Sequence, residues 1–329
     1  MNTLLNDPQY LGLIIAACCV LMTILAAPSF PLISVVSQAL AKSQKKSFYD
    51  KFGKQLTRMS LLFGGTALAI TALGALRYLT LDTSILQGPY TLPLGITAGL
   101  LLLAALCTSF YFGVWKSMRK QKSAHMLIGL LAAILSFAAL AFGATTAASL
   151  QSSLHVLPSV GTPLEILAAL LPIVSTPFLI HLLLALVIGF ALCGAFSLVY
   201  LLARREKDDF GRDYYKFAVP YAAKWAIAGA ILQAACTAAV FGSYYFYILS
   251  GALALTPTLQ TAIMNPLLIV WLAPMIIPLI ACIFWIFIIM SAAPMRRKVS
   301  MYCGALLMLV CNLCLFFILA ISLLLPVAS

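Results

Sequence analysis

Acidic residues are scarce in this sequence. Eight Asp and Glu occur among 329 residues, and all charged residues together make up 9% of the chain, against 64% hydrophobic residues. A soluble domain of this length needs far more charge to cover its surface, so the composition excludes that class. With a mean hydropathy of +1.08, most of the chain is expected to lie in lipid.

Long apolar stretches stand where a soluble protein would have charge. A bilayer core of about 30 Å needs roughly 20 apolar residues in a helix, and a helix satisfies its own backbone groups. We therefore predict an all-α integral membrane protein with about eight transmembrane helices. The expected helices cover residues 10–40, 59–79, 92–115, 125–149, 177–203, 217–247, 266–292 and 299–325. The first lacks a preceding positive region, so we expect it to be retained rather than cleaved, with a bend at Pro28 and Pro31.

Basic residues are confined to alternate connections. They follow the first, third, fifth and seventh predicted helices, whereas the other connections hold almost none apart from Arg77. The positive-inside rule makes these four connections cytoplasmic and predicts an N-out/C-out topology. The formal charge of +12 is therefore a topology signal, with contact to anionic lipid as a consequence, and it does not predict nucleic-acid binding.

The two halves of the chain are similar in pattern. Residues 38–52 and 199–217 each end a long helix in a basic segment, followed by an aromatic-Lys-Phe run into the next helix. Weak internal repeats are common in membrane folds. We therefore predict two four-helix bundles, one from residues 1–150 and one from 151–329. Between them, residues 163–171 are expected to form a short amphipathic helix at the outer surface.

The scarcity of acids also narrows the function. All eight acids lie in predicted loops, termini or cytoplasmic helix ends, so no buried carboxylate is available to a proton-coupled transporter. All nine cysteines lie in predicted helices, which argues against a disulfide framework and against a zinc site in a loop. His125 and His155 are expected in interfacial or solvated positions. His181 is expected at membrane depth, four residues after Pro177, where an imidazole needs either a hydrogen-bond partner or a haem iron.

The segment around His181 resembles a known family. Residues 180–218, IHLLLALVIGFALCGAFSLVYLLARREKDDFGRDYYKFA, are similar to the fifth helix of subunit I of cytochrome bd quinol oxidases, and residues 47–68 resemble that family's first cytoplasmic loop. The resemblance implies that His181 ligates a low-spin haem b near the outer face. It also implies a methionine on the seventh helix as second ligand, for which Met275 is the best positional match. Ligation by His and Met raises the potential of a haem.

Arg77 is the one basic residue expected on the outer side. It is a candidate to pair with a haem propionate or a quinone oxygen, because a guanidinium binds carboxylates in a bidentate manner. The alternative for Arg77 is an interfacial side chain that snorkels to the surface.

Other family features are missing. The first predicted helix has no histidine, with Cys18 or Cys19 near that level, and residues 92–115 contain no carboxylate for a proton path. The family's long outer loop between the sixth and seventh helices is also absent. We therefore do not expect oxygen reduction by this chain alone.

These observations predict a subunit of a redox complex in the bacterial inner membrane, not catalytic alone. It would pass electrons between the quinone pool and a periplasmic partner, a c-type cytochrome, using haem b. Two other functions remain open. One is a haem-free, quinone-binding membrane anchor of the polysulfide-reductase type, which also has eight helices. The other is a transporter or permease for an uncharged substrate, which would need no buried acids.

Overall fold

The structure is a computed structural model that describes residues 8–81, 91–153, 176–208, 210–249 and 257–324. These residues are helical throughout apart from turns and bends, and eight helices are long and apolar enough to cross a membrane. The predicted all-α membrane fold is confirmed at this level. The short helix predicted at 163–171 and His155 lie outside the described residues.

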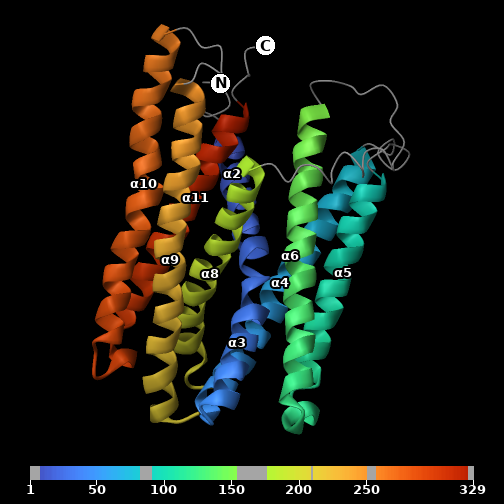
Figure 1. Cartoon of the computed structure of the whole chain (residues 1–329), viewed down its shortest axis with the longest axis vertical. Helices are drawn as coiled ribbons and strands as arrows, with labels where there is room; N and C mark the ends of the chain where they lie inside the picture. The colour runs from blue at the N-terminus through green and yellow to red at the C-terminus, as the bar shows by residue number, and fades with distance from the viewer. Residues whose placement is uncertain (1–7, 82–90, 154–175, 209, 250–256, 325–329) are drawn as a thin grey trace. The chain divides into compact units, whose positions relative to one another are not determined.

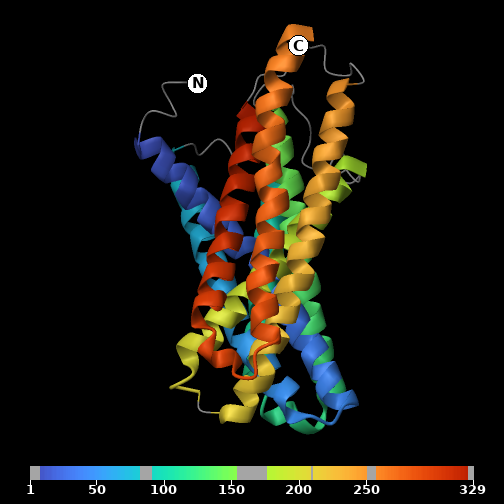
Figure 2. The ribbon, with the colours of Figure 1, turned by 90° about the vertical axis from the view of Figure 1, so that its left-hand side faces the viewer.

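The chain divides into two compact units, Thr23–Leu179 and Met1–Met22 together with Ile180–Ser329. We call them the first-half unit and the second-half unit. Most of the first helix, α2 (Pro8–Ala26), belongs to the second-half unit, although it lies in the first half of the chain. The division near residue 150 that the sequence predicts stays a prediction, because residues 154–175 are outside the described part of the chain. Each unit is described by itself below (Figures 1 and 2).

The first half of the chain forms the helices drawn in blue to green in Figure 1. The bend predicted in the first helix is present as a break at Ala27 and Pro28, between α2 and α3. Helix α4 begins twelve residues before the expected start at 59, because the basic segment before it is itself an amphipathic helix that buries Phe52 and Leu56. The helices are α2 Pro8–Ala26, α3 Ser29–Ser43, α4 Ser47–Leu81, α5 Thr91–Gly113 and α6 Lys122–Ser153, with a 3₁₀ turn η2 at Ser117–Lys120.

The second-half unit places α9, α10 and α11 side by side (Figures 1 and 2). Helix α10 begins at Pro257 rather than near residue 266, so it is longer than the sequence predicts. The helices are α8 Thr176–Arg204, α9 Arg212–Leu249, α10 Pro257–Ile289 and α11 Lys298–Leu324, with a 3₁₀ turn η4 at Pro294–Arg296.

Small residues bring α8 and α9 into close contact. A Cβ atom at Gly194 would overlap the backbone of Ala226, and one at Gly229 would overlap the backbone of Ala191. Membrane helices lack a hydrophobic drive to associate and rely on such close backbone packing. The Gly and Ala residues of these two helices therefore fix where they cross.

Apolar side chains cover the outside of both units. Leu102, Leu106 and Leu127 are each more than half exposed in the first-half unit, as is Ile283 in the second-half unit. Polar side chains such as Ser34 and Gln233, in contrast, are fully buried. This arrangement suits a lipid environment, where exposed apolar groups are favourable and polar groups must find partners inside the protein.

Candidate functional site

The three residues that the sequence singles out fall on three helices. His181 is in the second turn of α8 and Met275 is in α10, both half-buried and both in the second-half unit. Arg77 is in α4 of the first-half unit, and its side chain lies outside the described part of the structure. The predicted haem ligands therefore share a compact unit, whereas Arg77 belongs to the other one.

Counted from the first residue of their helices, His181 and Met275 do not lie at the same depth. His181 lies five residues after the first residue of α8, but Met275 lies 18 residues after the first residue of α10. From the sequence, this helix is expected to begin near Pro266, which would bring Met275 to a depth similar to that of His181, but the helix begins nine residues earlier. Ligation of one haem by both residues stays a prediction.

His125 corrects an expectation. The sequence predicts an interfacial or solvated ring because His125 directly follows a basic connection. The side chain is only 2% exposed and packs among aromatic rings, stacked on Tyr111 with ring centroids 4.4 Å apart and edge-on to Trp115 at 4.8 Å. Helix α6 begins at Lys122, three residues earlier, so His125 is already in the first turn and faces α5.

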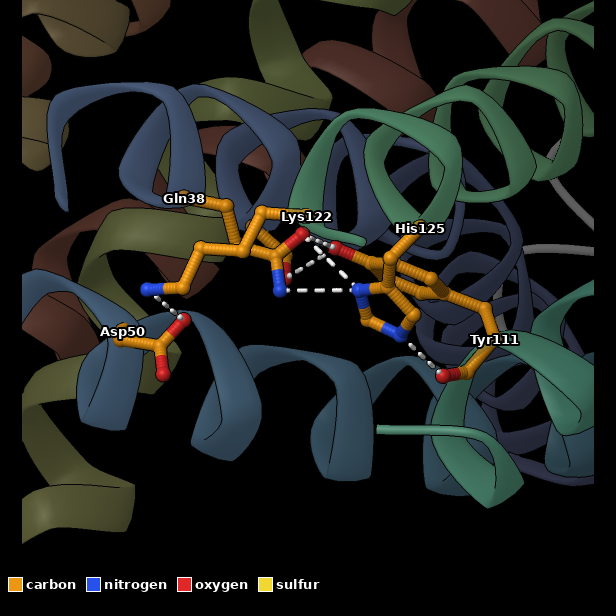
Figure 3. Close-up of polar contacts among 6 residues, drawn as sticks. Gln38, Asp50, Tyr111, Lys122 and His125 are labelled. Carbon is orange, nitrogen blue, oxygen red and sulfur yellow. Dashed lines mark hydrogen bonds and ion pairs between the residues drawn. The ribbon is translucent and has the colours of Figure 1, made fainter. Parts of the chain in front are cut away.

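Both ring nitrogens of His125 have partners (Figure 3). Nε2 lies 2.8 Å from the backbone oxygen of Tyr111, and Nδ1 lies 2.9 Å from Nε2 of Gln38. Because a carbonyl oxygen can only accept, Nε2 of His125 must carry a hydrogen. In the neutral ring Nδ1 is then the acceptor, which assigns the amide nitrogen of Gln38 to that side. The imidazole is held between α3 and α5 with no nitrogen left for a metal ion.

The Tyr111 carbonyl is available because α5 ends there. The backbone N–H of Trp115, the helical partner expected for that carbonyl, instead donates to the oxygen of Phe112 at 3.4 Å. The last carbonyls of a helix have no partner within it and need one from elsewhere. His125 supplies that partner, so its side chain caps α5 from the neighbouring helix α6.

The hydrogen-bonded chain continues from Gln38 into α4. The Tyr111 hydroxyl donates to Oε1 of Gln38 at 3.0 Å and lies 3.1 Å from Oγ of Ser34. Ser34 Oγ in turn donates to the Gly53 carbonyl at 2.8 Å and contacts Oγ1 of Thr57 at 2.9 Å. We call the residues Ser34, Gln38, Thr57, Tyr111 and His125 the polar network; it joins α3, α4, α5 and α6.

Charged groups lie just outside the polar network. Nζ of Lys122, one turn before His125, is 3.6 Å from Oδ1 of Asp50 on α4 (Figure 3). Nζ of Lys42 donates to Oγ of Ser123 at 2.7 Å. These contacts tie the basic end of α3 and α4 to the start of α6. Every side chain of the polar network has a protein partner, so the network is suited to a structural role.

A second polar cluster lies in the second-half unit. Nε2 of Gln233 on α9 donates to Oδ1 of Asn312 on α11 at 2.9 Å, and Asn312 donates to the Met308 carbonyl at 2.8 Å. The Cys311 thiol lies 3.6 Å from the Pro274 carbonyl on α10. That carbonyl has no helical donor because the residue four positions later is Pro278, which has no N–H. Three helices therefore meet at this cluster.

Two atoms of this cluster are buried without a protein hydrogen bond. They are Oε1 of Gln233 and Oγ1 of Thr237, one helical turn apart on α9, and both side chains are fully buried. A buried polar atom without a partner costs about 1–3 kcal/mol. A small polar group, such as water, would therefore gain by binding at these two positions.

Sequence reasoning missed both polar clusters. The pattern carried a signal, because Ser34 and Gln38 are four residues apart, as are Gly53 and Thr57 and also Gln233 and Thr237. That spacing puts polar groups on one face of an apolar helix. It does not identify the partner helix, which depends on how the bundle packs. Among the described residues, no group of three or more His, Cys, Asp or Glu side chains is placed to hold a metal ion.

No protein-family model and no curated protein matches the chain. The likeness to cytochrome bd subunit I therefore rests on the sequence motifs around His181 and in residues 47–68.

Proposed function

We propose that this chain is a membrane subunit of a redox complex in the bacterial inner membrane, holding haem b and exchanging electrons between the quinone pool and a periplasmic c-type cytochrome. In this proposal residues 1–150 and 151–329 each form a four-helix bundle, and both termini lie outside. The chain is not an oxygen reductase by itself. A bound haem supplies one-electron transfer; the protein's part is to supply ligands and a membrane position.

The position of His181 is the observation that carries this proposal. It lies inside the apolar span Leu179–Arg204 of α8, half-buried. An ionisable side chain at membrane depth is a functional candidate by default. His125, the other described histidine, cannot serve, because its two nitrogens are bound to Tyr111 and Gln38. His181 is thus the described histidine best suited to ligate iron.

The basic ends of the helices support the proposed orientation. In the second-half unit, the α8–α9 and α10–α11 connections both carry basic residues and lie at one end of that unit (Figure 1). Arg204 is the last residue of α8, and the span from His181 to it corresponds to about 35 Å along a helix. If the basic end is cytoplasmic, His181 is near the periplasmic surface, which suits electron exchange with a periplasmic partner.

The sequence also assigns roles to Met275, in the same unit as His181, and to Arg77, in the first-half unit. Met275 is the proposed second axial ligand, and its thioether would raise the potential of the haem. Arg77, in α4, is proposed to bind a haem propionate or a quinone oxygen. Both assignments rest on the sequence.

A reduced-minus-oxidised spectrum of the purified chain tests the proposal. We expect a b-type α-band that is absent from His181→Ala and shifted in Met275→Leu. His125→Gln is the matched control, because it changes a buried histidine that cannot ligate iron, and it should keep the band. A folded, colourless protein that still binds quinone would support the haem-free anchor instead.

A further inference from the structure

A basic hollow of about 630 Å³ lies at one end of the second-half unit. Five cationic side chains line it, from the α8–α9 connection, the start of α9, the turn η4 and the start of α11. They are Arg205, Arg212, Lys216, Arg296 and Lys298. We call this hollow the basic pocket. No acidic side chain is among its described lining residues.

Buried residues shape the walls of the basic pocket. The Tyr215 side chain is 4% exposed, and its hydroxyl donates to the backbone oxygen of Asp208 at 2.5 Å and contacts that of Arg205 at 3.4 Å. Gly211 has a φ of +84°, which turns the chain into α9. Pro294, at the start of η4, is buried and also lines the pocket. The pocket is thus a defined part of the fold.

The five cations of the basic pocket make no ion pair with a described acidic residue. Asp208, in the α8–α9 connection, is bound by Arg204, with Nη2 3.0 Å from Oδ1 and Nε 3.3 Å from Oδ2. Neither the ion pair Arg204–Asp208 nor the ion pair Lys122–Asp50 includes a cation of the pocket. Five like charges around one hollow repel one another, and a bound anion relieves that repulsion.

We propose that the basic pocket binds a phosphate group, supplied by the headgroup of an anionic phospholipid. Arg side chains match phosphate oxygens with paired hydrogen bonds. Basic pockets at the ends of membrane helices suit such headgroups. The wall also contains Ala292, Ala293 and Met295, which offer apolar contact next to the charged part. A soluble phosphate compound has the same charged group but lacks the apolar part.

A similar hollow in the first-half unit provides a control. It has a volume of about 570 Å³ and is lined by Lys42, Arg119, Lys120 and Lys122. One of these four is compensated, since Lys122 pairs with Asp50, and Lys42 donates to the neutral hydroxyl of Ser123. It therefore has fewer uncompensated cations, although it also lies in a basic connection. Substituting Arg119 and Lys120 removes two exposed charges without touching the basic pocket.

Lipid titration of the delipidated full chain in neutral detergent tests the proposal. The probes are a short-chain phosphatidylglycerol, the matching phosphatidylcholine, and inorganic pyrophosphate, with binding followed by thermophoresis at low salt. Each cation near a phosphate contributes about five-fold to affinity, so the Arg212→Gln, Arg296→Gln double variant should bind phosphatidylglycerol about 25-fold more weakly. The Arg119→Gln, Lys120→Gln control should bind it about as tightly as the wild type.

The binding results separate a lipid site from its alternatives. Phosphatidylglycerol binding that the pocket variant weakens and the control does not supports the lipid site. Pyrophosphate binding as tight as that of the lipid, with the same dependence on the pocket, overturns the lipid source in favour of a soluble phosphate compound. Equal weakening in both double variants, or equal affinity for phosphatidylcholine, overturns the proposal. Equal melting temperatures without lipid show that both variants are folded. A haem-free result would leave this test unaffected.

Discussion

The imidazole of His125 caps the helix that carries Tyr111, with its Nε2 2.8 Å from the Tyr111 carbonyl oxygen. The contact joins the end of α5 to the start of α6, across the connection that contains η2. Because the ring also accepts from Gln38 on α3, one side chain fixes three helices. The polar network thus orders the basic end of the first-half unit.

Removing the His125 cap should destabilise the protein. In His125→Leu, the Tyr111 carbonyl and the Gln38 amide both lose their bond to the ring, and a buried unsatisfied group costs about 1–3 kcal/mol. We expect a loss of about 2–6 kcal/mol for the two groups together, measured by thermal or denaturant unfolding in detergent. Lys122→Gln, which removes only the partly exposed pair with Asp50, should cost less than about 1 kcal/mol. Equal losses of unfolding free energy in the two variants would show that the buried cap contributes no more than the partly exposed ion pair.

Close packing of α8 and α9 should tolerate no added side chain. Gly194→Val would push its Cβ and methyl groups into the backbone of Ala226, which leaves no room for even the Cβ. Overpacking costs about 1–3 kcal/mol and more where backbone must shift. Gly242→Val on α9 is the matched control, because nothing lies within 4 Å of a Cβ there. A melting temperature lowered only by the first variant is the expected result; equal effects would contradict the close crossing.

The Gln233–Asn312 pair should behave as a unit. Either single change, Gln233→Leu or Asn312→Leu, leaves the other amide buried with a lost partner, and we expect each to destabilise the protein by about 1–3 kcal/mol. The double variant removes both polar groups, so it should be more stable than the sum of the two single changes predicts. Unfolding of all four proteins gives the coupling. Additive losses would mean that the 2.9 Å contact contributes little.

The helices were predictable from the sequence because apolar length alone determines them. The start of α4 was not, because residues 47–58 combine charged and amide side chains with a buried face at Phe52 and Leu56, a pattern that hydropathy treats as a loop. The burial of His125 was not predictable either. It depends on the end of α5 leaving the Tyr111 carbonyl open and on Gln38 facing the same point, and both are properties of the packed helices.

The haem proposal for His181 and Met275 concerns another part of the chain. Position along a helix follows from the sequence, and the start of α8 at Thr176 agrees with the Ser-Thr-Pro run at 175–177. The depth of Met275 relative to His181 depends instead on where α10 begins, and that helix starts nine residues before the predicted position. Two variants with different expected spectra therefore separate the roles of these residues.

Haem content, measured by a pyridine haemochrome assay on the purified chain, decides whether His181 is an iron ligand. We expect about one haem b per chain in the wild type and in His125→Gln. We expect none in His181→Ala, whose melting temperature should otherwise be unchanged. Haem retained at wild-type stoichiometry in His181→Ala, or absent from a correctly folded wild type, would contradict the proposal.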